Sequence, residues 1–334
     1  MNDEAFPARL ARIGQAFQES KIVLLGVDLG LFERLSTGPA TTTELARDLA
    51  TTERGMEILT DALAATGYLI KRGDRLANTD DVDRYLVPGR SGSLAHIMGH
   101  RNEMFSSWAR LDDVIRHGQT RQEADKPTLS DPKANRNFIL GMAEVGLGRV
   151  GLVLDRLPLS SSHRLVDLGG GPGHFACEAA RRLSTLVATV VDLPLTVSVA
   201  TEYVAGQGLA ERVSTQTCDF YRSDVLELGG DTDGVLISQV LHAEGESENR
   251  ALLTKIAPHI RPGGWVAVVE NLVDADRTSP VGAAMFAVNM LAGTARGRTY
   301  TEAEIAGWLR DAGFVPSPAE QVAERTWVVL GHKR

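Results

Sequence analysis

A glycine-rich segment offers the clearest chemistry in this sequence. The segment LVDLGGGPGHFA (165–176) begins as an apolar strand, passes through Gly169, Gly170 and Gly171, and runs into a helical pattern. Glycines permit positive φ angles and let a ligand approach the backbone closely. In a doubly wound sheet, ligands bind beyond the carboxyl ends of the strands. We therefore interpret this segment as a cofactor-binding loop.

The acid that precedes the glycines indicates the kind of cofactor. Asp167 lies two residues before Gly169. A dinucleotide fingerprint, G-x-G-x-x-G, places a pyrophosphate on the helix N-terminus, and a carboxylate at this position would repel it. The same carboxylate suits a cationic amino group. The pattern therefore favours a positively charged, zwitterionic nucleoside, which describes S-adenosylmethionine.

Acids at the ends of the next two predicted strands extend this site. Asp192, in VVDLP and followed by Leu193, stands where a carboxylate receives the ribose hydroxyls of an adenine nucleoside. Asp219 and Phe220, in CDF, can accept from the adenine amino group and pack on its ring. The alternative for each acid is a helix cap or a solvated carboxylate.

A histidine and a glutamate supply candidate acid–base chemistry. Methyl transfer to a hydroxyl needs positioning and an acceptor for the proton. His242 follows the predicted strand DGVLISQVLH, and Glu270 ends the next one, GWVAVVEN. An imidazole with an ordinary pKa near 6.5 suits a phenolic acceptor, and a neighbouring carboxylate can orient it. The alternatives are a loop histidine and a solvated acid without a role.

A metal site is not expected. His96 and His100 have the i, i+4 spacing that two ligands on a helix could use, but no third ligand accompanies them. Two solvated helix histidines are the simpler interpretation.

Strands must alternate with helices to place these residues together. From His163 the sequence alternates short β-branched strands with helical segments, the last helix opening with a capping box at Thr301 and Glu304. This order predicts an α/β, Rossmann-like, doubly wound and mostly parallel sheet over residues 151–334.

The N-terminal 90 residues have a different pattern. Helical spacing over residues 10–25 is followed by a second helix at 26–35 and a capping box at Thr41 and Glu44. Residues 68–79 alternate around a Gly-Asp turn, as a hairpin does. Helices followed by a hairpin are typical of a winged helix, so we predict such a domain over 1–90.

Residues 91–150 are predicted to be a helical linker that covers the active site. Residues 93–118 form one long helical pattern, and 138–157 form another. Between them, 120–137 is polar with two prolines and reads as a loop.

Composition excludes several classes of protein. The 334 residues carry 35 Lys and Arg against 43 Asp and Glu, a formal net charge of -8, which argues against binding a nucleic-acid backbone. Two cysteines cannot build a disulfide framework. The N-terminus has no apolar signal region, and the longest apolar stretches stop short of about 20 residues. We expect a cytoplasmic protein that does not span a membrane.

The ordered motifs resemble a known family. LVDLGGGPGHFA, VVDLP, CDF, ISQVLH, PGGWVAVVEN and TEAEIAGWLRDAGF resemble the S-adenosylmethionine-dependent small-molecule O-methyltransferases of plants and of bacterial secondary metabolism. The resemblance covers nearly the whole chain. It implies the class I methyltransferase fold, S-adenosylhomocysteine as product, and a homodimer formed through the winged-helix domain, which disfavours DNA binding.

The resemblance also assigns residues. It implies that His242 is the general base, that Glu270 orients it and that Ser238 contacts the adenosine side. The sequence departs from the family where Ala243 and Glu244 replace an acid and a tryptophan. The acceptor pocket is predicted from apolar helix residues and one amide, which plain packing could also explain: Phe105, Trp108, Met142, Met285, Phe286, Asn289 and Met290.

The predicted function is O-methylation of a small aromatic or polyketide-like natural product. A C- or N-methyltransferase could use the same histidine. A relative that binds S-adenosylmethionine but performs another reaction, such as decarboxylation or hydroxylation, fits the altered segment after His242. A winged-helix regulator with a ligand-binding domain is the alternative from another class.

Overall fold

The computed structural model describes residues 5–118, 127–224, 226–228 and 231–334. The chain separates into two compact units, residues 1–106 and 107–334. The three-part division at residues 90 and 150 stays a prediction.

Unit 1 combines helices with a small antiparallel sheet of order β1-β3-β2. Its helices are α1 (Phe6–Asp28), α2 (Leu31–Ser36), α3 (Thr42–Asp48), α4 (Glu53–Ala65), α5 (Asp80–Tyr85) and most of α6 (Ala95–Trp108). Its strands are β1 (Ala40–Thr41), β2 (Leu69–Arg72) and β3 (Arg75–Asn78). The predicted hairpin is present, with Arg72 opposite Arg75 across the turn. The capping box of α3 also forms, since Thr41 and Glu44 exchange backbone and side-chain hydrogen bonds.

Unit 2 contains the predicted doubly wound sheet. Its strands are β4 (Arg164–Leu168), β5 (Val187–Asp192), β6 (Val213–Thr217), β7 (Thr232–Ser238), β8 (Ile260–Glu270), β9 (Phe314–Pro316), β10 (Glu320–Ala323) and β11 (Thr326–Lys333). The sheet order is β10-β11-β8-β7-β4-β5-β6, with β9 on β11. Strands β4 to β8 are mutually parallel, whereas β11 runs antiparallel to β8.

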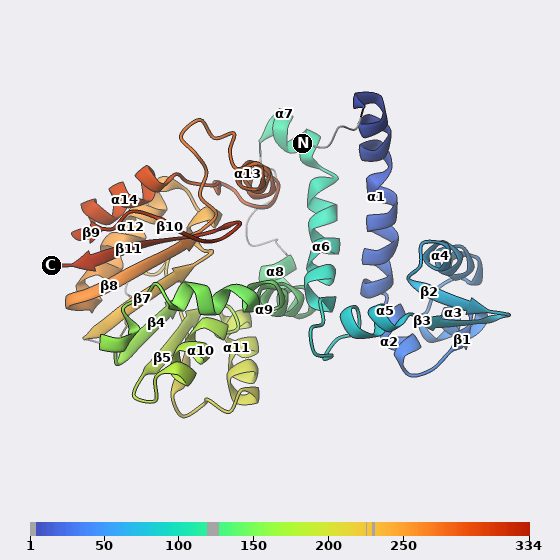
Figure 1. The fold of residues 1–334 in the computed structure, drawn as a ribbon, viewed down its shortest axis with the longest axis horizontal. Coiled ribbons are helices and arrows are strands. Elements are labelled where there is room, and N and C mark those ends of the chain that lie inside the picture. Colours follow the sequence, from blue (N-terminus) through green and yellow to red (C-terminus); the bar gives the residue numbers. More distant parts are fainter. Residues whose placement is uncertain (1–4, 119–126, 225, 229–230) are drawn as a thin grey trace. The chain divides into compact units, whose positions relative to one another are not determined.

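Helices pack on both faces of this sheet (Figure 1). The helices of unit 2 are α7 (Leu111–His117), α8 (Pro127–Ser130), α9 (Pro132–Leu154), α10 (His174–Arg182), α11 (Pro194–Gly206), α12 (Glu246–Ile256), α13 (Val281–Gly293) and α14 (Glu302–Asp311). Side chains alternate along each strand, so Leu236 packs with α9, α10 and α11, whereas its neighbour Val235 packs with α12 and α14. This alternation gives two apolar cores, one on each face.

Three helix boundaries differ from the predictions. The long helix expected over 93–118 is broken between α6 and α7. The loop expected over 120–137 contains α8 and the start of α9, because Pro132 fits the first turn of a helix and Asp131 caps it through the Ala134 N–H. Residues 119–126 lie outside the described part. The first helix continues to Asp28, and the chain breaks at Gly30 rather than near residue 26.

Among the helices of the described residues, α9 alone has the length and the apolar composition that crossing a membrane would require. Its residues Val150, Val153 and Leu154 belong to the core beneath it. A core helix of a globular protein passes the same test, so this helix fits its place on the sheet.

Candidate active site

The parallel strands bring the predicted site residues to one edge of the sheet. Asp167 is the last residue but one of β4, the glycines follow that strand, Asp192 ends β5, and Asp219 and Phe220 follow β6. Ser238 ends β7, and Glu270 ends β8. Because the carboxyl ends of parallel strands share one edge, residues from five strands come to the same edge of the sheet.

Asp167 is fully buried at the end of β4. Its Oδ2 accepts a hydrogen bond of 3.3 Å from the Ala176 N–H, and its Oδ1 has no hydrogen-bond partner among the described residues. Burial, opposed by that hydrogen bond, and the charge of Asp192 raise its pKa to about 7. A buried carboxylate with an unpaired oxygen fits a cationic ligand group, which would lower that pKa again.

Asp192 is held against the glycine loop. Its Oδ2 accepts from the Gly171 N–H at 3.0 Å, and its Oδ1 accepts from the Leu193 N–H at 2.7 Å. Burial nevertheless raises its pKa to about 6, because desolvation exceeds the effect of these hydrogen bonds. The hydroxyl groups of a ribose would donate further hydrogen bonds to the Asp192 carboxylate, which burial has left incompletely solvated.

The glycines serve different purposes. A Cβ on Gly170 would stand 2.6 Å from Cγ of Asp167, so this glycine makes room for the buried carboxylate. Gly171 has a φ of 57°, and a Cβ there would meet nothing within 4 Å. Its surface is therefore open to a ligand, as the predicted cofactor loop requires.

Phe220 packs beside this loop, whereas Asp219 is engaged locally. The Phe220 ring comes within 3.3 Å of the position that a Cβ on Gly169 would take. The Asp219 Oδ1 accepts from the Arg222 N–H at 3.1 Å, and its Oδ2 lies 3.4 Å from Arg222 Nη1. The adenine contact of Asp219 stays a prediction.

His242 and Glu270 form a hydrogen-bonded pair. Nδ1 of His242 lies 2.8 Å from Oε2 of Glu270, and the His242 N–H donates to Oε1 at 3.3 Å. The Glu270 side chain is only 3% exposed, against 13% for His242. With Nδ1 directed at the carboxylate, Nε2 is the ring nitrogen left to accept a proton.

Helix α13 packs on this pair. The Phe286 ring meets the His242 ring edge-on at 4.8 Å between centroids. One turn later, Asn289 Oδ1 accepts from the Trp108 indole N–H at 2.9 Å. Met290 is buried, whereas Met285 is 52% exposed. Phe286 thus contacts His242 directly, a contact that was not predicted from the sequence.

The remaining predicted pocket residues are more scattered. Met142 lies half-buried on α9. Phe105 belongs to unit 1, where its ring lies 4.9 Å from Lys21 Nζ. Their roles at the acceptor stay predictions.

Several residues around His242 were not predicted from the sequence. Asn249 on α12 is completely buried and bonds to the turn that carries His242. The Tyr221 and Tyr300 hydroxyls bond to the same region. A polar residue at an inward position of a helix, one turn before Leu252 and Leu253, was the available signal for Asn249.

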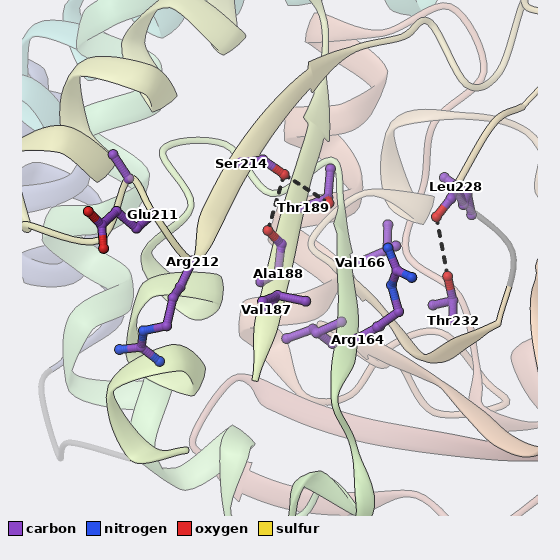
Figure 2. A pocket seen from close by; sticks show the side chains of 12 residues that line it. Arg164, Val166, Val187, Ala188, Thr189, Glu211, Arg212, Ser214, Leu228 and Thr232 are labelled. Atoms are coloured by element: carbon purple, nitrogen blue, oxygen red, sulfur yellow. Dashed lines mark hydrogen bonds between the residues drawn. The ribbon is translucent and has the colours of Figure 1, made fainter. Parts of the chain in front are cut away.

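A cavity of about 180 Å³ lies at the opposite, amino-terminal ends of β4, β5 and β6. Arg164, Glu211 and Arg212 line it, together with Ser214, whose hydroxyl lies 3.0 Å from that of Thr189 (Figure 2). None of the predicted site residues lines this cavity. Among the described residues, no group of three or more His, Cys, Asp or Glu side chains is arranged to hold a metal.

Comparisons with known proteins show which family the chain resembles. Residues 108–315 match the family model for an O-methyltransferase domain. The chain is 34% identical over 322 residues to the 3-hydroxy-5-methyl-1-naphthoate 3-O-methyltransferase of Streptomyces sahachiroi, covering 92% of this chain and 89% of that protein. It is 29% identical to the tetracenomycin polyketide synthesis 8-O-methyl transferase TcmO of Streptomyces glaucescens, covering 98% and 97%.

A solved structure supports the fold. Human N-acetylserotonin methyltransferase in complex with S-adenosylmethionine superposes with a TM-score of 0.80 at 24% identity, covering 100% of this chain and 99% of that chain. The matched domain and the sequence relatives show that this chain belongs to the O-methyltransferase family, whose methyl donor is S-adenosylmethionine.

Proposed function

We propose that this O-methyltransferase methylates a hydroxyl group on a small aromatic or polyketide-like molecule, with His242 as the proton acceptor. The observation that carries the proposal is the 2.8 Å hydrogen bond between His242 Nδ1 and Glu270 Oε2. Relatives named for a hydroxynaphthoate and for tetracenomycin support an aromatic, polyketide-like acceptor.

The residues around the glycine loop would hold the donor. Bound S-adenosylmethionine supplies a methyl group that is already activated for displacement. Asp167 would pair with a cationic group, and Asp192 would accept from the ribose hydroxyls. The other residues assigned to the donor are Gly169, Gly170, Gly171, Leu193, Asp219, Phe220 and Ser238.

The proton would leave the acceptor through His242. Glu270 directs Nδ1 inward, so Nε2 faces outward as the basic atom and receives the hydroxyl proton. The resulting imidazolium is stabilised by the Glu270 carboxylate. Phe286 packs edge-on against this ring.

The pH–rate profile of the His242→Gln variant tests this role. With 3-hydroxy-5-methyl-1-naphthoate among a panel of hydroxyarenes, turnover should fall roughly 10²- to 10⁴-fold near neutral pH. The loss should shrink as the pH approaches the pKa of the acceptor hydroxyl, because an ionised acceptor needs no base. Calorimetry should give an unchanged affinity for S-adenosylmethionine. Overlaid profiles at every pH would exclude His242 as the base.

We also propose that residues 1–90 form a winged-helix domain that joins two copies of the chain. Helix α1 exposes an apolar stripe of Phe6, Leu10, Ile13 and Phe17, each more than half exposed. Such a stripe on a helix at i, i+4, i+7 spacing is typical of a face that packs on another helix.

Light scattering tests the dimer. Ile13→Glu should convert a homodimer into monomers at micromolar concentration, because a charge in an apolar interface is costly to bury. Ile58→Glu, at an equally exposed isoleucine on α4, is the matched control and should leave the dimer intact. A monomeric wild type would overturn the proposal.

A further inference from the structure

The short turn that carries His242 is secured by residues outside it. His242 lies in a single 3-10 turn, Leu241–Ala243, after the end of β7. Such a turn has few internal hydrogen bonds. Asn249, from α12, donates from Nδ2 to the Leu241 carbonyl at 2.9 Å and lies 3.5 Å from the Glu244 carbonyl. One buried amide therefore binds the backbone on both sides of His242.

Tyr221 fixes the orientation of that amide. Its hydroxyl donates to Asn249 Oδ1 at 2.7 Å. Burial and the carboxylates of Glu244 and Glu270 raise the pKa of the Tyr221 phenol, so the hydroxyl stays protonated and remains a donor. Because Oδ1 accepts from this hydroxyl, the amide nitrogen must point at the turn.

The same tyrosine belongs to the segment assigned to the cofactor. Tyr221 directly follows Phe220, and the two rings lie 5.2 Å apart between centroids. Phe220 in turn packs beside Gly169 of the glycine loop. A continuous chain of contacts thus runs from the donor loop through Phe220, Tyr221 and Asn249 to the turn of His242.

We propose that Tyr221 and Asn249 are positioning residues that fix the imidazole of His242 relative to the cofactor segment. The inference rests on the proposed role of His242 as proton acceptor. Neither side chain needs to contact the acceptor or the donor's methyl group. Their effect is exerted through the backbone of residues 241–244, whose displacement would turn Nε2 away from the acceptor hydroxyl.

A spectroscopic test needs no acceptor. In protein with ¹⁵N-labelled histidine, the ring N–H of His242 bonded to Glu270 should give a downfield proton resonance, identified by its absence from His242→Ala. The resonance should broaden or vanish in Tyr221→Phe and Asn249→Ala. It should persist in Ser162→Ala, which removes a buried hydrogen bond to Trp265 at the far end of the sheet. The proposal would be overturned if the wild type lacked the resonance. It would also be overturned if the resonance were unchanged in both Tyr221→Phe and Asn249→Ala.

Measurements of turnover distinguish a positioning role of Tyr221 and Asn249 from a purely structural one. With saturating S-adenosylmethionine and 3-hydroxy-5-methyl-1-naphthoate, kcat should fall roughly 3- to 10-fold in Tyr221→Phe and 10- to 100-fold in Asn249→Ala. Neither change should lower kcat further when combined with His242→Ala, since both act through that ring. Tyr221→Phe keeps the aromatic ring, so it tests the idea even if Asn249→Ala fails to fold.

The outcomes distinguish this inference from the proposed function. Full activity of His242→Ala would refute both the role of His242 as the base and the positioning role of Tyr221 and Asn249. A strong loss in His242→Ala, with equal further losses when Tyr221→Phe or Asn249→Ala is added, would refute the positioning role alone and leave His242 as the base.

Discussion

The carboxylates at the ends of β4 and β5 and the carboxylate at the end of β8 lie on one sheet edge but have opposite surroundings. Asp167 accepts from the Ala176 N–H and Asp192 from the N–H groups of Gly171 and Leu193, and burial raises their pKa values to about 7 and 6. Glu270 instead bonds both the ring and the backbone of His242. The two aspartates, here called the donor side, thus keep carboxylate oxygens that can accept hydrogen bonds from a ligand. His242 and Glu270, here called the proton side, are already bonded to each other.

This difference predicts separable effects on donor affinity and on turnover. A substitution on the donor side should act on the binding of S-adenosylmethionine, and one on the proton side should act on kcat.

Asp192→Ala should weaken S-adenosylmethionine binding roughly 10- to 100-fold, because hydrogen bonds to a charged group contribute about 1.5–3 kcal/mol. Calorimetry measures the change, and Asp311→Ala, an exposed acid paired with Arg250, is the control that should have no effect. Turnover at saturating donor should stay close to wild type. A comparable loss of kcat would break the division into a donor side and a proton side.

Glu270→Gln should lower kcat about 10-fold, less than removal of His242, because the amide can still accept from Nδ1 but carries no charge to stabilise the imidazolium. The dissociation constant for S-adenosylmethionine should change less than about 2-fold. Steady-state kinetics with both substrates checks the split. The comparison would fail if donor affinity fell as far as turnover.

Asp167→Asn should stabilise the ligand-free protein at alkaline pH. The raised pKa of Asp167 means that the folded state holds this proton more tightly than the unfolded chain does. Its contribution to stability is therefore present below the ordinary carboxyl pKa and is lost as the pH rises through about 7. Asparagine stays neutral, so Tm at pH 8 should rise by about 2–5 °C.

Thermal melts at pH 5 and pH 8 check this sign. The gain in Tm should be smaller at pH 5, where Asp167 is protonated. Added S-adenosylmethionine should raise the Tm of the variant less than that of wild type, because the variant lacks the anionic partner. A variant less stable than wild type at pH 8 would show that the carboxylate is not destabilising there.

Much of the fold could be predicted from local pattern. The alternation of β-branched strands and helices after residue 163 gave the parallel sheet, and both predicted capping boxes form. The errors lie where local signals are ambiguous. Two prolines between residues 120 and 137 suggested a loop, although Pro127 and Pro132 each begin a helix.

The sequence alone determined that the candidate cofactor residues and the His242–Glu270 pair share one edge of the sheet, because each lies at or just after the end of a strand and parallel strands end at the same edge. Tertiary structure decided how they are held. The 2.8 Å bond from His242 to Glu270, the edge-on contact of Phe286 and the hydrogen bond of the Asn249 amide depend on how α12, α13 and β8 pack together. No spacing in the chain encodes such distances, since they arise only when distant side chains pack and exclude water.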